Sequence, residues 1–328
     1  MAEDRDDAAR VSVIHEPDGD PAWQESMAFV FCDLDADVAG SAAFGTFVNR
    51  GAGLSWLGVA AGRRPGAVLQ RSRNDVSLVA SDRTAARLGV GGVHWEQHDG
   101  GVGVLIASDE GAELRLEFAD DYPPTPWHDT QGESLDRLAA GHVECSGRVR
   151  GSVRVGEVEV TVDGWGHRDQ SWGPRSTSIV RNHRWVAGSC GPRLGFSTEA
   201  LHLADGTVVT MGFVARDGVV VRSTEVSTLV TLDHDGLTPR RFESRVRLET
   251  GEELTITSEE ILVCLFNHRD PLVAIDAVAR VRCGDLVGFA DLNMIANPQA
   301  GTSLPSRLLG GSLEDGVRAR TPATGTVC

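Results

Sequence analysis

The chain has 328 residues, of which 41% are hydrophobic and 24% are charged, and its formal net charge is −16. All 31 basic residues are arginine, which excludes chemistry that needs a lysine amine, such as Schiff-base formation, pyridoxal-phosphate attachment or Walker-type phosphate binding. The acidic excess argues against nucleic acid and anionic membranes as partners, because both are bound through clustered basic residues.

The length predicts two domains, because one hydrophobic core rarely grows beyond about 250–300 residues. We expect a flexible leader over residues 1–20, an N-terminal β domain over 21–141, a C-terminal β-barrel over 142–300 and a peripheral tail over 301–328. The boundary near residue 141 follows the proline-rich segment Tyr122–Trp127, which cannot be a central strand, and a short helix predicted over Glu133–Ala140.

The strand signal dominates both halves. Val158, Val160 and Val162 alternate with polar residues, as in a half-buried antiparallel strand. In the second half, Asp-Gly or Thr-Gly pairs at 205–206, 217–218, 235–236 and 250–251 separate the runs Thr207–Ala215, Val219–Ser223 and Arg241–Leu248. The first half carries a weaker version of this pattern. An all-β fold is therefore predicted, with meanders that lose their edges by closing into antiparallel barrels.

No apolar stretch approaches the ~20 residues that a membrane-spanning helix needs, and the N-terminus is acidic rather than signal-like. We therefore expect a cytoplasmic protein without membrane insertion. Six cysteines without a Cys-x-x-Cys pair favour buried free thiols over disulfides.

Histidine spacing gives little support for a metal site. On a strand, His94 and His98 would lie about 13 Å apart by the strand rise, too far for one ion. His167, His183 and His202 can converge only if the fold brings their strands together, and structural roles are favoured for them. The motifs Gly-x-Ser-x-Gly and Gly-x-Gly-x-x-Gly are absent, so neither a serine hydrolase nor a dinucleotide-binding domain is indicated.

Residues 164–175 hold the highest concentration of candidate functional residues, with two tryptophans, two arginines, an aspartate and three glycines. One interpretation is a functional site, with kinked backbone and rigid indole walls. The alternative is a structural bulge in which Arg168 and Asp169 pair and Trp172 closes one end of a barrel.

The run Arg-Asp-Gln-Ser-Trp-Gly at 168–173 resembles the Arg-Asp-His-Ser-Trp-Gly signature of the hydroxyneurosporene synthase (carotenoid 1,2-hydratase) and AttH group. Similar surrounding features are Glu25-Ser26 with Phe29, His142 to Gly147, Arg184-Trp185 and Asn297-Pro298. The resemblance implies two tandem lipocalin-like (calycin-type) antiparallel β-barrels and no organic cofactor. It also implies a hydrophobic small-molecule substrate, since relatives include hydratases of isoprenoid double bonds and cyclases of polyenes.

In the carotenoid hydratases a His-x-Trp pair in this motif and a later acidic residue are important. Trp172 matches the tryptophan, whereas Gln170 replaces the histidine. Glu199 corresponds to the later acid by its spacing.

The residues themselves suggest roles for two carboxyls. Glu199 alternates in phase with Leu201 and Leu203, so burial without a cation would leave it protonated and able to donate a proton. Alternatively, it faces solvent or pairs with an arginine such as Arg184. Asp169 adjoins Arg168, which would hold it ionised as a base or as a stabiliser of a carbocation.

We expect Asp169, Glu199 and Trp172 to be catalytic, with cation–π attraction of ~1–2 kcal/mol from each indole face. The expected substrate-binding residues are Trp165, Arg168, Gln170, His183, Trp185 and Phe196.

Three hypotheses of function follow. The first is a cofactor-independent acid/base enzyme, a hydratase or dehydratase, isomerase or cyclase, that acts on an apolar isoprenoid or polyene substrate in a barrel or interdomain cavity. The second is a binding or carrier protein for a lipophilic molecule. The third is a cyclase that works by preorganisation alone.

Overall fold

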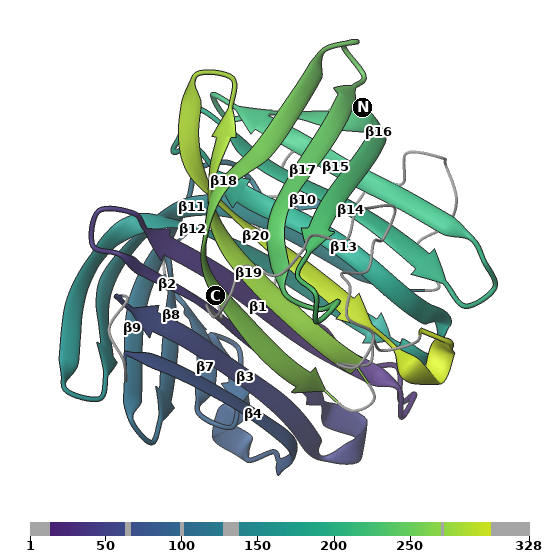
Figure 1. Ribbon diagram of the computed structural model, residues 1–328. Helices are drawn as coiled ribbons and strands as arrows, with labels where there is room; N and C mark the ends of the chain where they lie inside the picture. The colour runs from purple at the N-terminus through teal and green to yellow at the C-terminus, as the bar shows by residue number, and fades with distance from the viewer. Residues whose placement is uncertain (1–13, 63–66, 99–101, 127–137, 270–271, 303–328) are drawn as a thin grey trace.

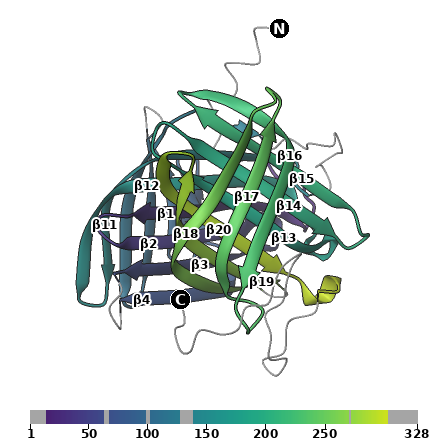
Figure 2. The same ribbon diagram turned by 45° about the horizontal axis from the view of Figure 1, so that its top comes forward.

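The computed structural model describes residues 14–62, 67–98, 102–126, 138–269 and 272–302. Its strands form two units, a curled sheet and a closed barrel, that pack against each other (Figures 1 and 2). The all-β class predicted from the sequence is confirmed. Among the described residues, no helix is long and apolar enough to cross a bilayer.

The first unit is a sheet with the strand order β4-β3-β2-β1-β12-β11-β9-β8-β7-β6-β5, and β10 pairs with β11. Its strands are β1 (Trp23–Asp33), β2 (Val38–Phe47), β3 (Ala52–Ala61), β4 (Val68–Ser77), β5 (Arg83–Thr84), β6 (Arg87–Val90), β7 (Val93–Gln97), β8 (Val102–Asp109), β9 (Ala112–Asp120), β10 (Thr125–Pro126), β11 (Gly141–Val155) and β12 (Val158–Pro174). Since β4 and β5 are its ends, this unit is a curled half-barrel and not the closed barrel that was expected.

The second unit is a closed antiparallel barrel in which each strand pairs with the next and the last pairs with the first. Its strands are β13 (Val180–Ser189), β14 (Gly195–Leu203), β15 (Val208–Arg216), β16 (Val219–Leu232), β17 (Pro239–Leu248), β18 (Glu253–Arg269), β19 (Leu272–Cys283) and β20 (Leu286–Ala296). Asp217 and Gly218, in the turn between β15 and β16, have φ angles of 50° and 77°. Both angles are positive, as a type I′ hairpin turn requires.

The boundary predicted near residue 141 lies inside the first unit. β11 and β12 pair with each other, with β9 and with β1, so the chain changes sheet only between Pro174 and Val180. The predicted boundary is misplaced because β1 pairs with β12, which is far away in the sequence. No local turn signal indicates such a pairing. The Arg-Asp-Gln-Ser-Trp-Gly motif therefore belongs to the half-barrel and not to the C-terminal barrel. Most of the predicted helix Glu133–Ala140 lies outside the described residues.

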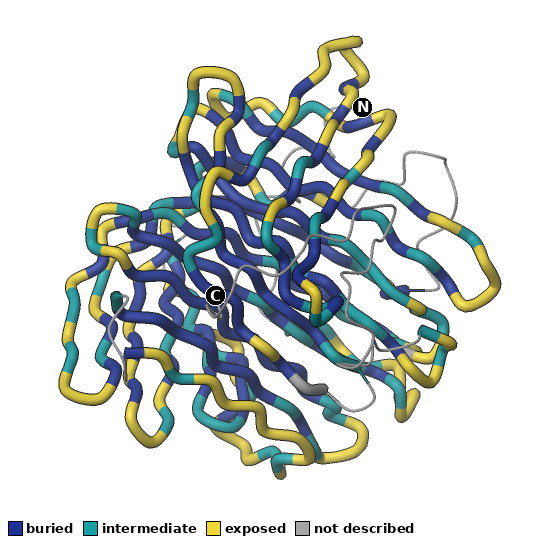
Figure 3. Tube along the Cα trace, viewed as in Figure 1, coloured by how far each residue is buried: buried dark blue, intermediate teal, exposed yellow. Residues whose placement is uncertain are grey.

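Buried residues follow the strands of both units (Figure 3). Each unit has its own apolar core, and a third apolar cluster lies between them. Inside the half-barrel, Phe29 stacks on Trp95 with ring centroids 5.1 Å apart, and Trp95 meets Phe118 edge-on. Such aromatic pairs stabilise a core by about 0.5–1.5 kcal/mol beyond burial. In the third cluster, Val30 and Trp56 of the half-barrel pack with Leu265, Val278 and Phe289 of the barrel, which fixes the two units against each other.

Five of the six cysteines lie in the described residues, and all five are buried and free. They are Cys32, Cys145, Cys190, Cys264 and Cys283. The prediction of small buried thiols is confirmed for these residues.

Candidate active site

A cavity of about 390 Å³ lies between the half-barrel and the barrel. This volume falls within the range of about 300–1,000 Å³ that is typical of small-molecule sites. The half-barrel contributes side chains from β1, β2, β3, β11 and β12, and the barrel contributes side chains from β13, β14, β19 and β20. Its apolar lining includes Phe44, Phe47, Leu54, Trp185, Leu201, Leu272 and Ile295. Its polar lining includes His142, Glu144, Asp169, Ser171, Arg175, His183, Glu199 and Asn293.

Strand alternation decides which residues of the central motif reach the cavity. Residues that pair directly across antiparallel strands lie on the same face of the sheet. Asp169 pairs with Ala28 on the face that meets the barrel, whereas Arg168 pairs with Phe29 on the face that forms the core of the half-barrel. Asp169 and Ser171 therefore line the cavity, and Arg168, Gln170 and Trp172 lie on the opposite face.

The expected pairing of Arg168 with Asp169 is wrong, because neighbours on a strand point in opposite directions. Arg168 instead donates two hydrogen bonds to Asp120, of 3.0 Å from Nε and 2.6 Å from an Nη atom. Its guanidinium also lies over the rings of Trp95 and Phe118, 5.4 and 5.8 Å from their centroids. Arg168 anchors the half-barrel core and does not touch the cavity.

We expect Arg168→Met to lower the free energy of unfolding by about 1–3 kcal/mol, because it leaves Asp120 without its charged donor. Turnover per folded molecule should be unchanged. Chemical denaturation combined with activity measured on folded protein tests this prediction. A selective loss of turnover would show instead that Arg168 serves the site.

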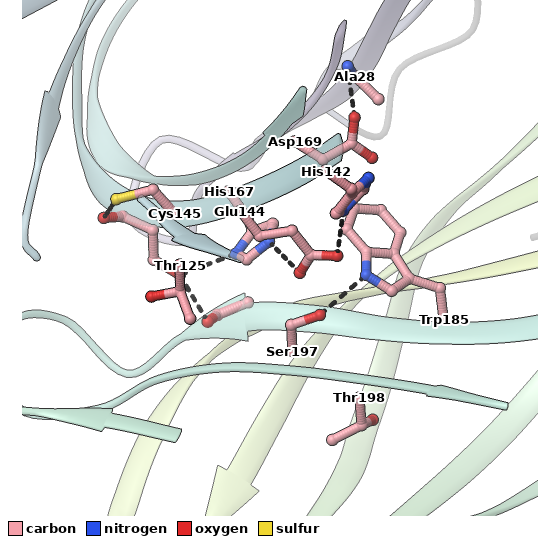
Figure 4. A network of polar contacts seen from close by, with 12 residues as sticks. Ala28, Thr125, His142, Glu144, Cys145, His167, Asp169, Trp185, Ser197 and Thr198 are labelled. Atoms are coloured by element: carbon pink, nitrogen blue, oxygen red, sulfur yellow. Dashed lines mark hydrogen bonds and ion pairs between the residues drawn. The ribbon is translucent and has the colours of Figure 1, made fainter. Parts of the chain in front are cut away.

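Two histidines and a glutamate form a buried cluster in the half-barrel (Figure 4), and two of the three, His142 and Glu144, line the cavity. Glu144 accepts contacts from Nε2 of His142 at 2.9 Å and Nε2 of His167 at 3.2 Å. Nδ1 of His142 lies 3.2 Å from the Ser171 hydroxyl, and Nδ1 of His167 lies 2.9 Å from the Ser146 hydroxyl. Ser146 in turn donates to the carbonyl of Gly188, at 3.1 Å, and so connects the cluster to the barrel.

The surroundings of two neighbouring carboxyls shift their pKa values in opposite directions. Glu144 on β11 stands directly opposite Asp169 on β12. Burial acts to raise the pKa of Glu144, but the hydrogen bonds and charge of His142 and His167 outweigh it and hold the pKa below the ordinary value of 4.5. For Asp169, burial raises the pKa above its ordinary value of 3.8; His142 opposes this effect and Glu144 adds to it. Glu144 is thus the ionised member of the pair, and Asp169 the member that holds a proton more firmly.

The barrel wall presents a second carboxyl–imidazole pair. Oε1 of Glu199 lies 2.8 Å from Nδ1 of His183, and both residues line the cavity. The predicted phase of Glu199 with Leu201 is correct, but the face on which they lie meets the half-barrel and is not the barrel interior. Between the walls, Trp185 donates from Nε1 to the Ser197 hydroxyl at 2.9 Å, and its ring meets that of His167 edge-on at 5.5 Å.

Four of the residues predicted for the site line the cavity, namely Asp169, His183, Trp185 and Glu199. The other five lie elsewhere in the described part of the chain. Phe196 lies in the barrel core, Trp165 packs between the units beside Arg148, and Trp172 stacks on His15 at 3.8 Å. Arg168 and Gln170 lie on the inner face of the half-barrel.

Sequence reasoning missed the cluster of His142, Glu144 and His167. The spacing His-x-Glu at the start of β11 placed two polar side chains on one strand face, but nothing local showed that β11 would pair with the motif strand. His94 contacts Asp82, and His98 contacts Glu96, rather than each other. Among the described residues, no group of three or more His, Cys, Asp and Glu side chains has the geometry to hold a metal ion.

The family described as Domain of unknown function (DUF7064) matches residues 9–298. The chain belongs to this family. No curated protein sequence matches it.

Several solved structures share the fold of this DUF7064 protein. An AttH-like protein from Nitrosomonas europaea is 12% identical, with a TM-score of 0.63 over 84% of this chain and 92% of its own. CghA, in a structure with Sch210972, is 13% identical, with a TM-score of 0.60 over 88% and 95%. Kievitone hydratase from Nectria haematococca is 10% identical, with a TM-score of 0.55 over 87% and 93%. The similarity to the AttH group proposed from the central motif is thus supported at the level of fold.

Proposed function

We propose that this protein is an acid/base enzyme without an organic cofactor that moves a proton within an apolar, isoprenoid or polyene substrate. The observation that carries the proposal is that titratable groups lie on both walls of the cavity. Glu144 and Asp169, whose pKa values are shifted in opposite directions, lie on the half-barrel wall. Glu199 and His183 lie on the barrel wall. Two titratable groups in environments that separate their pKa values are the usual arrangement of acid and base catalysis.

In this proposal Asp169 is the acid. Its raised pKa favours the protonated carboxyl, which can donate to an alkene carbon or to a leaving hydroxyl. This reverses the role expected from the sequence, because Arg168 is turned away and no longer keeps Asp169 ionised. Glu144, held as a carboxylate by its imidazoles, supplies fixed negative charge beside the developing cation.

Glu199 is the base on the opposite wall. Its Oε1 atom contacts His183, whereas its buried Oε2 atom has no hydrogen-bond partner among the described residues. Oε2 can therefore accept a proton from the carbon next to the cation, which gives isomerisation or dehydration. It can also accept a proton from a water molecule that adds to the cation, which gives hydration. The indole face of Trp185 stabilises the cation between these two steps.

The shared fold supports a reaction of this kind. Kievitone hydratase is a hydratase by name, and CghA has been solved with Sch210972. The mixed lining, with Phe44, Phe47 and Leu272 beside the carboxyls, suits an apolar skeleton that carries few polar groups.

The test is a panel of terpenoid and polyene compounds, incubated with the full chain and followed by mass spectrometry. A compound converted to a product that differs by water, or to an isomer, supports the proposal. Unmodified ligand that is retained across the panel would instead identify a carrier protein.

We expect Glu199→Gln to lower kcat on the order of 10²-fold, because the amide cannot accept the proton. The amide preserves the shape of the side chain, so the unfolding temperature should change little. Steady-state kinetics with the converted compound measures this effect. Full activity in this variant would remove Glu199 from the mechanism.

A further inference from the structure

We propose that Asp276, acting through Asn293, fixes His183 with a proton on Nε2, so that Nδ1 of His183 and Glu199 share one proton at the cavity wall. Asp276 and Asn293 are positioning residues in this proposal, because they act on the base through His183. The role of Glu199 itself rests on the proposed function.

We call the chain of contacts from Asp276 through Asn293 and His183 to Glu199 the relay. Its residues lie side by side in one row on the four neighbouring strands β14, β13, β20 and β19. Glu199 pairs with Trp185, Trp185 pairs with Asn293, and Asn293 pairs with Asp276 across successive strands. His183, two residues before Trp185, lies on the same face and contacts both sides of the row. Its Nδ1 atom is 2.8 Å from Oε1 of Glu199, and its Nε2 atom is 2.6 Å from Oδ1 of Asn293.

The chemistry of the contacts sets the direction of the hydrogen bonds. A carboxylate only accepts, so the amide nitrogen of Asn293 must face Asp276, and it donates to Oδ1 of that residue. The amide oxygen is then the atom that faces His183. Because that oxygen carries no proton, Nε2 of His183 must donate.

Asp276 accepts a hydrogen bond through each of its two carboxyl oxygens. Its Oδ2 atom accepts from the Ser41 hydroxyl of the half-barrel at 2.9 Å, and Ser41 accepts from Nε1 of Trp56 at 3.3 Å. On the next strand, Asp291 is fully buried and lies close to Asp276. Burial, reinforced by the charge of Asp276, raises the pKa of Asp291 well above its ordinary value. Asp291 therefore holds the proton of this pair, which leaves Asp276 as the acceptor for Ser41 and Asn293.

The relay leaves a single arrangement at the cavity. With Nε2 of His183 committed to Asn293, only Nδ1 faces Glu199, and one proton lies between Nδ1 and Oε1. The remaining carboxyl oxygen, Oε2, is the atom free to react. The docking of Ser41 onto Asp276 thus connects the packing of the two units to the protonation state of the site.

The test is ¹⁵N NMR of the full chain labelled on its histidine rings, with the His183 signals assigned from a His183→Gln sample. We expect Nε2 of His183 to be protonated in the native protein. In Asn293→Leu, which removes the acceptor at similar size, the Nε2 signal should move toward the unprotonated range. The matched control is Asn267→Leu, a buried asparagine on β18 that contacts Ser72 and not His183, and it should leave the signals unchanged.

A native spectrum with Nε2 unprotonated would overturn the proposal, and so would an Asn293→Leu spectrum identical to that of the native protein. If Asn293→Leu does not fold, the native spectrum alone decides. With the compound identified by the panel, Asn293→Leu should also lower kcat by roughly 10–100-fold, the range found when the partner that orients a metal-binding histidine is removed.

The NMR signature needs no substrate, so it separates the two proposals. A protonated Nε2 together with full activity of Asp169→Asn and Glu199→Gln would reject the proposed function and retain the relay. Loss of activity in both variants together with an unprotonated Nε2 would reject the relay alone.

Discussion

Asp169→Asn is expected to lower kcat/KM by about 10²–10⁴-fold, the usual contribution of a positioned general acid. The amide keeps the size of the side chain and can still contact the Ala28 backbone N–H, which donates to Oδ1 of Asp169 at 3.2 Å. It has no acidic proton to give. The free energy of unfolding should therefore be nearly unchanged while the chemical step is lost.

The pH profile gives a second readout of the same residue. The active form of Asp169 is protonated, and its pKa is raised above the ordinary value of 3.8. Native activity should consequently fall as the pH rises through the pKa of Asp169 in the protein. The residual activity of Asp169→Asn should lack this fall, because the titrating group is gone.

Asp163→Asn is the matched control for Asp169→Asn. Asp163 lies on the same strand but is exposed, where it pairs with Arg148 and Arg150. This substitution should leave the kinetics and their pH dependence unchanged. Native turnover in Asp169→Asn would assign proton donation to another group and remove the main support for the acid role.

Local patterns were sufficient for much of the fold. Turn signals such as Asp-Gly predicted β15, the start of β16 and most of β17 in the second unit, whose neighbours in sequence are also neighbours in the barrel. The same reasoning misplaced the domain boundary, because β1 pairs with β12 across more than a hundred residues. Pairing of this kind is decided by which apolar faces meet, and a single sequence does not state it.

In the candidate site, too, local features were predicted correctly and features that depend on strand pairing were not. Glu199 was placed correctly in phase with Leu201, because that relation is local. The expectation for Asp169 was reversed, since its neighbour in sequence, Arg168, lies on the other face of the sheet and bonds to Asp120. Glu144 was missed, because its ionisation depends on contacts with two imidazoles, one from β11 and one from β12. Contacts between strands therefore determine the chemistry that the sequence could only partly predict.

Glu144→Gln is expected to lower the free energy of unfolding by about 3–5 kcal/mol, the cost of removing one partner from a buried charged network. Glu144 and His167 are both fully buried, and the carboxylate accepts from both imidazoles. An amide can accept through its oxygen only, so its NH₂ group would face one of these ring N–H donors. Denaturant titration of the folded variant measures the loss.

The effect of Glu144→Gln should depend on pH in a defined direction. Since the pKa of Glu144 is lowered in the folded protein, its contribution to stability is complete above the ordinary value of 4.5 and declines as the pH falls below it. The difference between native protein and variant should therefore shrink in acid. Glu113→Gln on β9, which removes an exposed partner of Arg154, provides the control and should change stability by less than about 0.5 kcal/mol. A difference between native protein and Glu144→Gln that stays constant with pH would mean that the loss comes from shape alone, and that the two imidazoles do not hold Glu144 as an anion beside Asp169.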